Sequence, residues 1–314
     1  MKRRLFKVTM VLLSLILIGA LIVTSGILVK PNFLTQDQLT EIPTYDILSW
    51  QAQREVQLTE DVSNEVGFND PYVIVDPYQM NPLSAMVLFH AENKAHYTVT
   101  VLAPHPYAQL VFHYDKPSGF IQLPIIGLYP GITNQVKIEN GTQSVTLSIE
   151  TEALPSDFQT LNLIESHPDS MEPGFTLFVA CFDHSYTALI DQDGAVRAYF
   201  SNTSFAHGTS VILLENGHLL ATGDELKQVP YNMTSLWELD WMGKVYQEIE
   251  IPNGIHHDLS LLPDGRILAA SNNANMFETG TREDVAIIVN LQTGAIEESI
   301  DFRTLLDEER APYN

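Results

Sequence analysis

Three polar side chains at the head of one segment are the residues best suited to chemistry. The stretch from Ile255 to Gly265 reads Ile-His-His-Asp-Leu-Ser-Leu-Leu-Pro-Asp-Gly, so two histidines and an aspartate precede a run of leucines. An imidazole can donate a hydrogen bond to an anion or act as a nucleophile. A metal ion shared by the three is not expected, because neighbouring residues of a strand face opposite sides of the sheet.

The residues after the histidines predict the strands that position them. Leucines within 259–262 supply an apolar strand, and Pro263-Asp264-Gly265 is a turn, because proline fixes φ and glycine allows a positive φ. Residues 266–270 predict the returning strand. A related unit lies upstream, where Leu-Leu-Glu-Asn-Gly217 precedes a similar strand 48 residues before Gly265.

A second turn marker repeats with almost the same period. Hairpins are predicted where Asp-Gln-Asp-Gly194, Asp-Trp-Met-Gly243 and Asn-Leu-Gln-Thr-Gly294 separate apolar runs, and these glycines are 49 and 51 residues apart. A period of about 50 residues with about four short strands is typical of β-propeller blades. The sequence therefore predicts an all-β protein in which residues 174–314 form the first blades of an incomplete β-propeller.

Residues 76–154 are predicted to form a β-sandwich before the propeller. Apolar or alternating segments recur at intervals of about ten residues, a spacing typical of such sandwiches. The segments are 85–90, 95–102, 110–114, 120–126, 134–138 and 144–150. Three prolines make 155–173 a connector, and the polar residues 31–75 predict a lead-in that is either a helix or a loose linker.

The first 30 residues predict export from the cytoplasm. They contain five basic residues and no acidic ones, and Val8–Val29 is uncharged and apolar. A stretch of this length can span a bilayer, and the basic flank keeps the N-terminus in the cytoplasm. Two alternatives follow: a signal anchor, giving a single-pass cell-membrane protein with an extracytoplasmic domain, or a cleaved signal peptide, giving a secreted protein.

Composition excludes two classes of interaction. The formal net charge is −23, and so acidic a surface repels nucleic-acid phosphates. Cys181 is the single cysteine, which excludes an intrachain disulfide. Its apolar neighbours predict a buried, unreactive thiol.

In its motifs and their order, the chain resembles the bacterial arylsulfate sulfotransferases over about residues 70–314. The resemblance rests on Leu-Pro-Ile-Ile-Gly-Leu-Tyr-Pro-Gly at 123–131, followed by His-His-Asp-Leu-Ser-Leu-Leu-Pro-Asp-Gly at 256–265, after an export signal. It implies a β-sandwich followed by a six-bladed propeller. It also implies transfer of a sulfuryl group from an aryl sulfate donor to a phenol acceptor through a sulfated histidine, with no cofactor. The resemblance further suggests a homodimer.

Only one histidine of the pair can be carried over from the resemblance. We favour His257 as the catalytic candidate because it directly precedes the Asp-Leu-Ser-Leu strand; His256, the second candidate, is then expected to point the other way. The family's sulfated histidine, arginine and His-x-Asn segment lie in later blades and match no residue here. The chain is therefore expected to be a fragment that is inactive alone. The alternative is a non-catalytic extracytoplasmic β-propeller that binds a ligand or a protein.

Overall fold

Antiparallel β-strands make up most of the chain that the structure describes, as the alternating sequence predicted. The computed structural model describes residues 46–60, 62, 66–172, 174–180, 186–200, 211–227, 232–272 and 285–305. All of them belong to one unit, residues 44–314. Among these described residues, the helical elements are α2 (Ile47–Glu60), α5 (Phe302–Leu305) and two 3₁₀ turns, Pro106–Ala108 and Pro168–Ser170.

Two expectations for the chain lie outside the described residues. The apolar stretch Val8–Val29 and the residue Cys181 both fall there. Within the part of the chain that the structure describes, no helix is long and apolar enough to cross a membrane.

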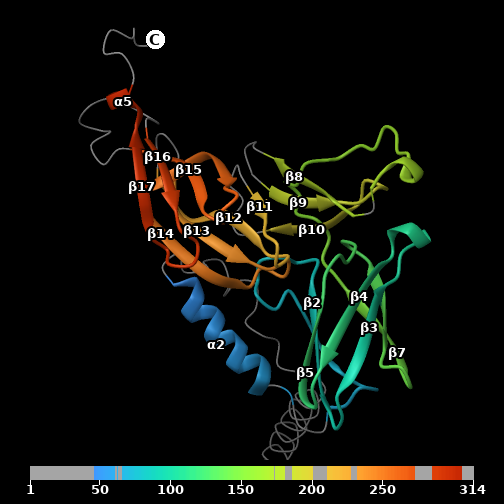
Figure 1. Cartoon of the computed structure of the whole chain (residues 1–314). Coiled ribbons are helices and arrows are strands. Elements are labelled where there is room, and N and C mark those ends of the chain that lie inside the picture. Colours follow the sequence, from blue (N-terminus) through green and yellow to red (C-terminus); the bar gives the residue numbers. More distant parts are fainter. Residues whose placement is uncertain are drawn as a thin grey trace, which may run out of the picture. The chain divides into compact units, whose positions relative to one another are not determined.

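The first strands form two antiparallel sheets (Figure 1). A three-stranded sheet has the order β1-β2-β5, and a four-stranded sheet has the order β4-β3-β6-β7. Their bounds are β1 Tyr72–Val75, β2 Ala85–Ala91, β3 Ala95–Val101, β4 Leu110–Lys116, β5 Gly119–Ile125, β6 Thr133–Glu139 and β7 Ser144–Glu150.

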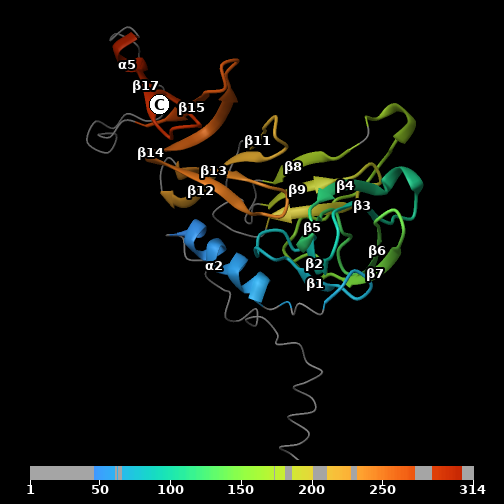
Figure 2. The same cartoon turned by 60° about the horizontal axis from the view of Figure 1, so that its bottom comes forward.

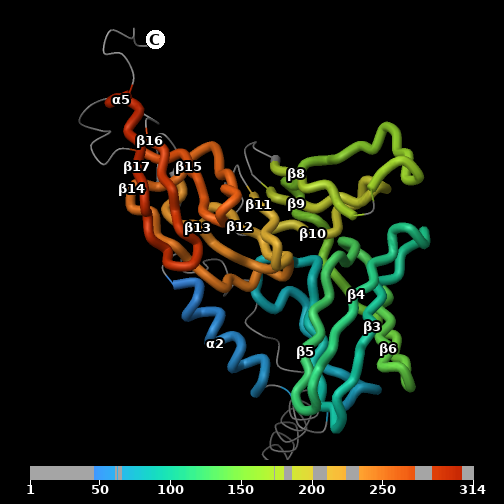
Figure 3. Tube along the Cα trace, viewed as in Figure 1, coloured from blue at the N-terminus to red at the C-terminus, as the bar shows by residue number. Residues whose placement is uncertain are grey.

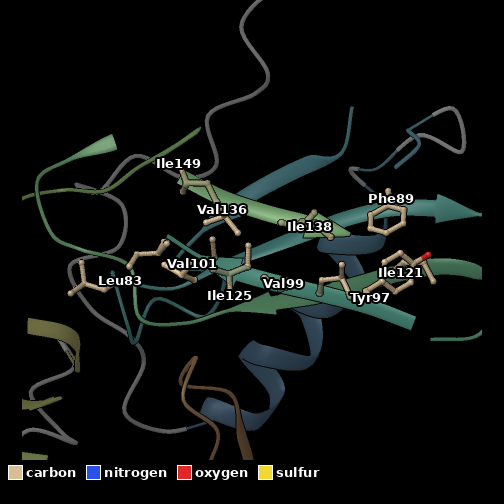
Figure 4. Packing of buried hydrophobic residues seen from close by; sticks show 14 of the residues in the cluster. Leu83, Phe89, Tyr97, Val99, Val101, Ile121, Ile125, Val136, Ile138 and Ile149 are labelled. Carbon is tan, nitrogen blue, oxygen red and sulfur yellow. The ribbon is translucent and has the colours of Figure 1, made fainter. Parts of the chain in front are cut away.

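One hydrophobic core joins these two sheets (Figure 4). The alternation of β3 predicts that Tyr97, Val99 and Val101 share a face, and all three are buried. They belong to the same cluster as Phe89 of β2 and Ile121 of β5. The rings of Phe89 and Tyr97 meet edge to face with centroids 5.5 Å apart, a preferred aromatic geometry. A core shared by two sheets is the arrangement expected of a β-sandwich.

The later strands form two more antiparallel sheets (Figures 1 and 2). One has the order β10-β9-β8, and the other contains β11 to β17 in chain order. Their bounds are β8 Thr176–Ala180, β9 Tyr186–Ile190, β10 Val196–Phe200, β11 Val211–Leu213, β12 Leu219–Lys227, β13 Asn232–Leu239, β14 Val245–Leu261, β15 Ile267–Ser271, β16 Val285–Val289 and β17 Ile296–Asp301.

Strand β14 connects two groups of four strands, which Figure 3 shows following one another from yellow to red. Its first part, from Val245, pairs with β13, and its last part, to Leu261, pairs with β15. One group is therefore β11, β12, β13 and the first part of β14; the next is the last part of β14 with β15, β16 and β17. Four strands per repeat agrees with the prediction. The described residues do not show a closed propeller, which stays a prediction.

The turns between these strands repeat as predicted. Gly194, Gly243 and Gly294 have φ values of 78°, 88° and 71°, which glycine adopts at little steric cost. In each turn a side-chain oxygen accepts two backbone N–H groups. Asp191 Oδ1 accepts from Asp193 and Ala195, Asp240 Oδ1 from Met242 and Lys244, and Asn290 Oδ1 from Gln292 and Thr293. The repeated hairpins are thus confirmed.

A buried arginine ties β10 to the loops of the first two sheets. The Arg197 side chain is fully buried and pairs with Asp191 Oδ2 at 2.8 Å. Its Nε donates to the Gly127 carbonyl at 2.8 Å, and its guanidinium lies 3.9 Å from the centroid of the Tyr129 ring. A buried charge needs such partners, because its desolvation is costly. Asp191 therefore stabilises its own turn through Oδ1 and is held by Arg197 through Oδ2.

Helix α2 and the loop after β1 both contact the hairpin at Gly243. Gln51 donates from Nε2 to the Gly243 carbonyl at 2.8 Å and accepts from the Val245 N–H at 2.7 Å. Met80 lies so close to Gly243 that a Cβ atom there would be 2.0 Å from the Met80 Cβ. This hairpin, which leads into β14, therefore has almost no free space around its glycine.

Candidate functional site

The two candidate histidines lie in a β-bulge of β14. Ile255 pairs with Ser271 of β15, and the next pair is Leu259 with Ala269. The residues 256–258 of β14 therefore lie opposite Ala270 alone. A bulge bends a strand and turns its side chains away from the regular alternation, and bulges are common beside active sites.

The backbone at His257 explains how the bulge is accommodated. Its φ is +60°, in the left-handed region that is uncommon for residues other than glycine, although asparagine, aspartate and histidine enter it more often than the rest. The conformation costs about 1–2 kcal/mol for a residue with a side chain, so surrounding contacts must maintain it. Backbone strain of this kind is concentrated at functional sites, which makes the position notable.

The prediction that His256 and His257 point in opposite directions is wrong. Their Nδ1 atoms are 2.9 Å apart, and the rings meet edge to face with centroids 5.1 Å apart. The error has a physical cause: strict alternation holds only for a regular strand, and the left-handed residue in the bulge brings the two rings together. The candidate site therefore contains a contacting imidazole pair.

The two rings differ in their surroundings. His256 is 6% exposed, and its Nε2 lies 3.0 Å from the Ser271 carbonyl oxygen. Ser271 is buried too, and its hydroxyl donates to the Gly254 carbonyl at 2.7 Å. His257 is exposed. His256 thus contacts the exposed ring of His257 through Nδ1 and the buried Ser271 through Nε2.

Asp258 completes the polar segment at the surface. It is exposed, and its Oδ1 accepts a hydrogen bond from the Leu259 N–H at 2.9 Å. This local bond holds the carboxylate at the end of the bulge. Within the described residues, no cluster of three or more histidine, cysteine or acidic side chains is arranged to hold a metal ion.

Ser271 is the neighbour that sequence reasoning missed. The turn around Gly265 pairs Leu261 with Ile267, and extending that register would place Ser271 opposite His257. The bulge instead places Ser271 opposite Ile255, where its carbonyl meets His256. The only signal in the sequence was the repeated turn, which sets the register at one end of the strand.

The described surface also has a hollow of about 620 Å³ elsewhere. Apolar and aromatic side chains such as Tyr129, Phe158 and Val196 line much of it. None of its lining residues comes from β14 or β15, so it is not part of the candidate site.

The imidazole pair can do two kinds of chemistry with an anionic ligand. An N–H of His257 can donate a hydrogen bond to a negatively charged oxygen, and its neutral form can accept a proton. A sulfate ester is such a ligand, because its transfer builds negative charge on oxygen that N–H donors stabilise.

Two family models match the chain, and both describe arylsulfotransferase domains. The family model described as arylsulfotransferase Ig-like domain matches residues 72–152, and the model described as arylsulfotransferase (ASST) matches residues 160–314. No curated protein matches the chain.

Among solved structures, the chain is similar to a structural genomics protein of unknown function from Bacteroides thetaiotaomicron. The two are 11% identical with a TM-score of 0.26, and the match covers 68% of this chain and 55% of the other. The chain thus spans little more than half the length of that protein.

Proposed function

Because the chain belongs to the arylsulfotransferase family, we propose that it takes part in moving a sulfuryl group from an aryl sulfate ester to a phenol. The observation that carries this proposal is the match of both family models, in chain order, to residues 72–152 and 160–314. The exposed imidazole of His257, held against the buried ring of His256 in a bulge, supports it, because a protonated His257 ring can offer an N–H donor to an anionic ester.

The proposed reaction has two displacement steps. A histidine nitrogen attacks sulfur, the bond from sulfur to the aryl oxygen breaks, and the phenolate leaves. The oxygen of the acceptor phenol then attacks the sulfur of the sulfo-histidine and gives its proton to a base. The nitrogen–sulfur bond breaks, the histidine is regenerated, and the new aryl sulfate leaves. Two steps through a covalent intermediate replace one difficult direct transfer.

We assign His257 to sulfuryl binding. No histidine of this chain matches the family's sulfated histidine, so the attack on sulfur is assigned to a histidine outside this sequence. We also propose that the two four-strand groups are propeller blades and that the domain is extracytoplasmic. The repeated turns and the basic, apolar N-terminal segment support these two statements.

The test is binding of 4-nitrophenyl sulfate to the 314-residue chain, compared with binding of 4-nitrophenol. We expect the ester to bind more tightly, and His257→Gln to remove this preference. His218→Gln is the matched control, because His218 is a partly exposed histidine whose Nδ1 lies 2.7 Å from Glu238 Oε1, outside the candidate site. Equal affinity for both compounds in the wild type would contradict the proposal and favour a binding module for another ligand.

Turnover is the second readout. The chain alone is expected to release no nitrophenol from 4-nitrophenyl sulfate when phenol is added. Phenol-dependent release would contradict the assignment of the nucleophile to a residue outside this sequence, while supporting sulfuryl transfer itself.

A further inference from the structure

Hydrogen-bond donors and acceptors around the imidazole pair restrict where its protons can lie. The Ser271 carbonyl can only accept, so His256 Nε2, 3.0 Å away, must carry a proton. The two Nδ1 atoms are 2.9 Å apart, a hydrogen-bond distance, so a single proton lies between them. In a neutral pair, His256 Nδ1 is therefore the acceptor, and His257 Nδ1 is the donor.

We infer that His256 is a positioning residue that holds His257 in the Nδ1–H tautomer. The role that this gives His256 in sulfuryl binding rests on the proposed function of His257. The tautomer of His257 can be measured whether or not that function is correct. With the proton on Nδ1, Nε2 is the other ring nitrogen, and in the neutral ring it carries no proton. In the neutral state Nε2 has a lone pair, and after protonation it becomes an N–H donor, while the bond to His256 persists unchanged.

The sheet itself maintains this arrangement. Ser271 is held by its pairing with Ile255 and by the bond from its hydroxyl to Gly254. His256 is buried, so its ring cannot turn to water without opening the bulge. The acceptor for His257 is therefore preorganised, in the same sense that an orienting group fixes the tautomer of a catalytic histidine elsewhere.

The pair also excludes one charge state. If both rings were cationic, both Nδ1 atoms would carry protons and point at each other across 2.9 Å. The pair can then hold at most one positive charge while its contact persists. A sulfuryl group carries one negative charge in the ester, so one cationic ring matches the charge that His257 is proposed to meet.

The test is nitrogen NMR of the full chain with ¹⁵N-labelled histidine, recorded without any ligand. Protonated and unprotonated ring nitrogens differ widely in chemical shift, and His257→Gln identifies the His257 signals. We expect the neutral His257 to have a protonated Nδ1 and an unprotonated Nε2. Because a free imidazole prefers the opposite tautomer, the result is diagnostic. A protonated Nε2 with an unprotonated Nδ1 in the wild type would overturn the inference.

Two variants separate positioning from folding. His256→Leu removes the acceptor, so His257 is expected to change to the Nε2–H tautomer. His256→Asn is expected to keep Nδ1–H, because its amide oxygen can occupy the place of the imidazole Nδ1. If the leucine variant does not fold, the spectra of the wild type and of the asparagine variant still show whether His257 carries its proton on Nδ1. Failure of sulfate ester binding would leave this result intact, so the two proposals fail separately.

Discussion

The left-handed backbone of His257 predicts an unusual response to glycine. In a regular strand, glycine is less stable than alanine by about 0.5–1 kcal/mol, because the unfolded chain gains freedom. At φ +60° an alanine bears a strain of about 1–2 kcal/mol that glycine avoids. The greater freedom of the unfolded chain thus favours alanine, whereas the backbone strain favours glycine. His257→Gly is therefore expected to be more stable than His257→Ala by about 0.5–1 kcal/mol.

Comparing two variants at one position isolates the backbone. Both lose the contact between the His257 ring and His256, so that loss cancels. Ser260 is the matched control: it is exposed on the same strand and pairs regularly with Leu268. There the order reverses, and Ser260→Gly is expected to be less stable than Ser260→Ala. The difference between the two positions, about 1–2 kcal/mol, is the strain itself.

Urea unfolding of the four variants measures these differences. With a denaturant slope of about 1–3 kcal/mol per molar urea, 1 kcal/mol moves the midpoint by roughly 0.3–1 M. If glycine lowers the midpoint relative to alanine by the same amount at both positions, His257 is extended in solution. The bulge geometry, and with it the Nδ1 contact, would then be wrong.

Two further predictions concern packing and pH. Gly243→Ala is expected to lose about 1–3 kcal/mol more than Gly265→Ala in urea unfolding. The two glycines have φ values of 88° and 84°, but only at Gly243 would the new Cβ meet Met80; equal losses would contradict this packing. Burial raises the pKa of the Asp76 carboxyl from 3.8 to about 7. A raised carboxyl pKa stabilises the folded state most below pH 4, and the stabilisation is lost as pH rises through 7. The urea midpoint of Asp76→Asn should therefore fall less than that of the wild type between pH 4 and 8. If both midpoints changed equally with pH, the raised pKa of Asp76 would be refuted.

The sequence alone determined the local structure. The strands from β2 to β7 and the turns at Gly194, Gly217, Gly243, Gly265 and Gly294 follow from alternation and turn chemistry, whereas β1 lies in the segment 31–75 that predicted a helix or a linker. These signals act over a few residues, so they can be read without the fold. The family followed from the order of the motifs, and both histidines were identifiable as candidates.

Only the tertiary structure decided how the histidines meet. The register of β14 is set from two sides, since Ile255 pairs with Met233 of β13 and with Ser271 of β15. The Gly265 turn sets a different register at the other end of the strand, and the bulge at 256–258 absorbs the mismatch. Neither constraint is visible in the residues of the bulge itself. The contact between His256 and His257 is therefore a property of three paired strands, which is why alternation along one strand could not predict it.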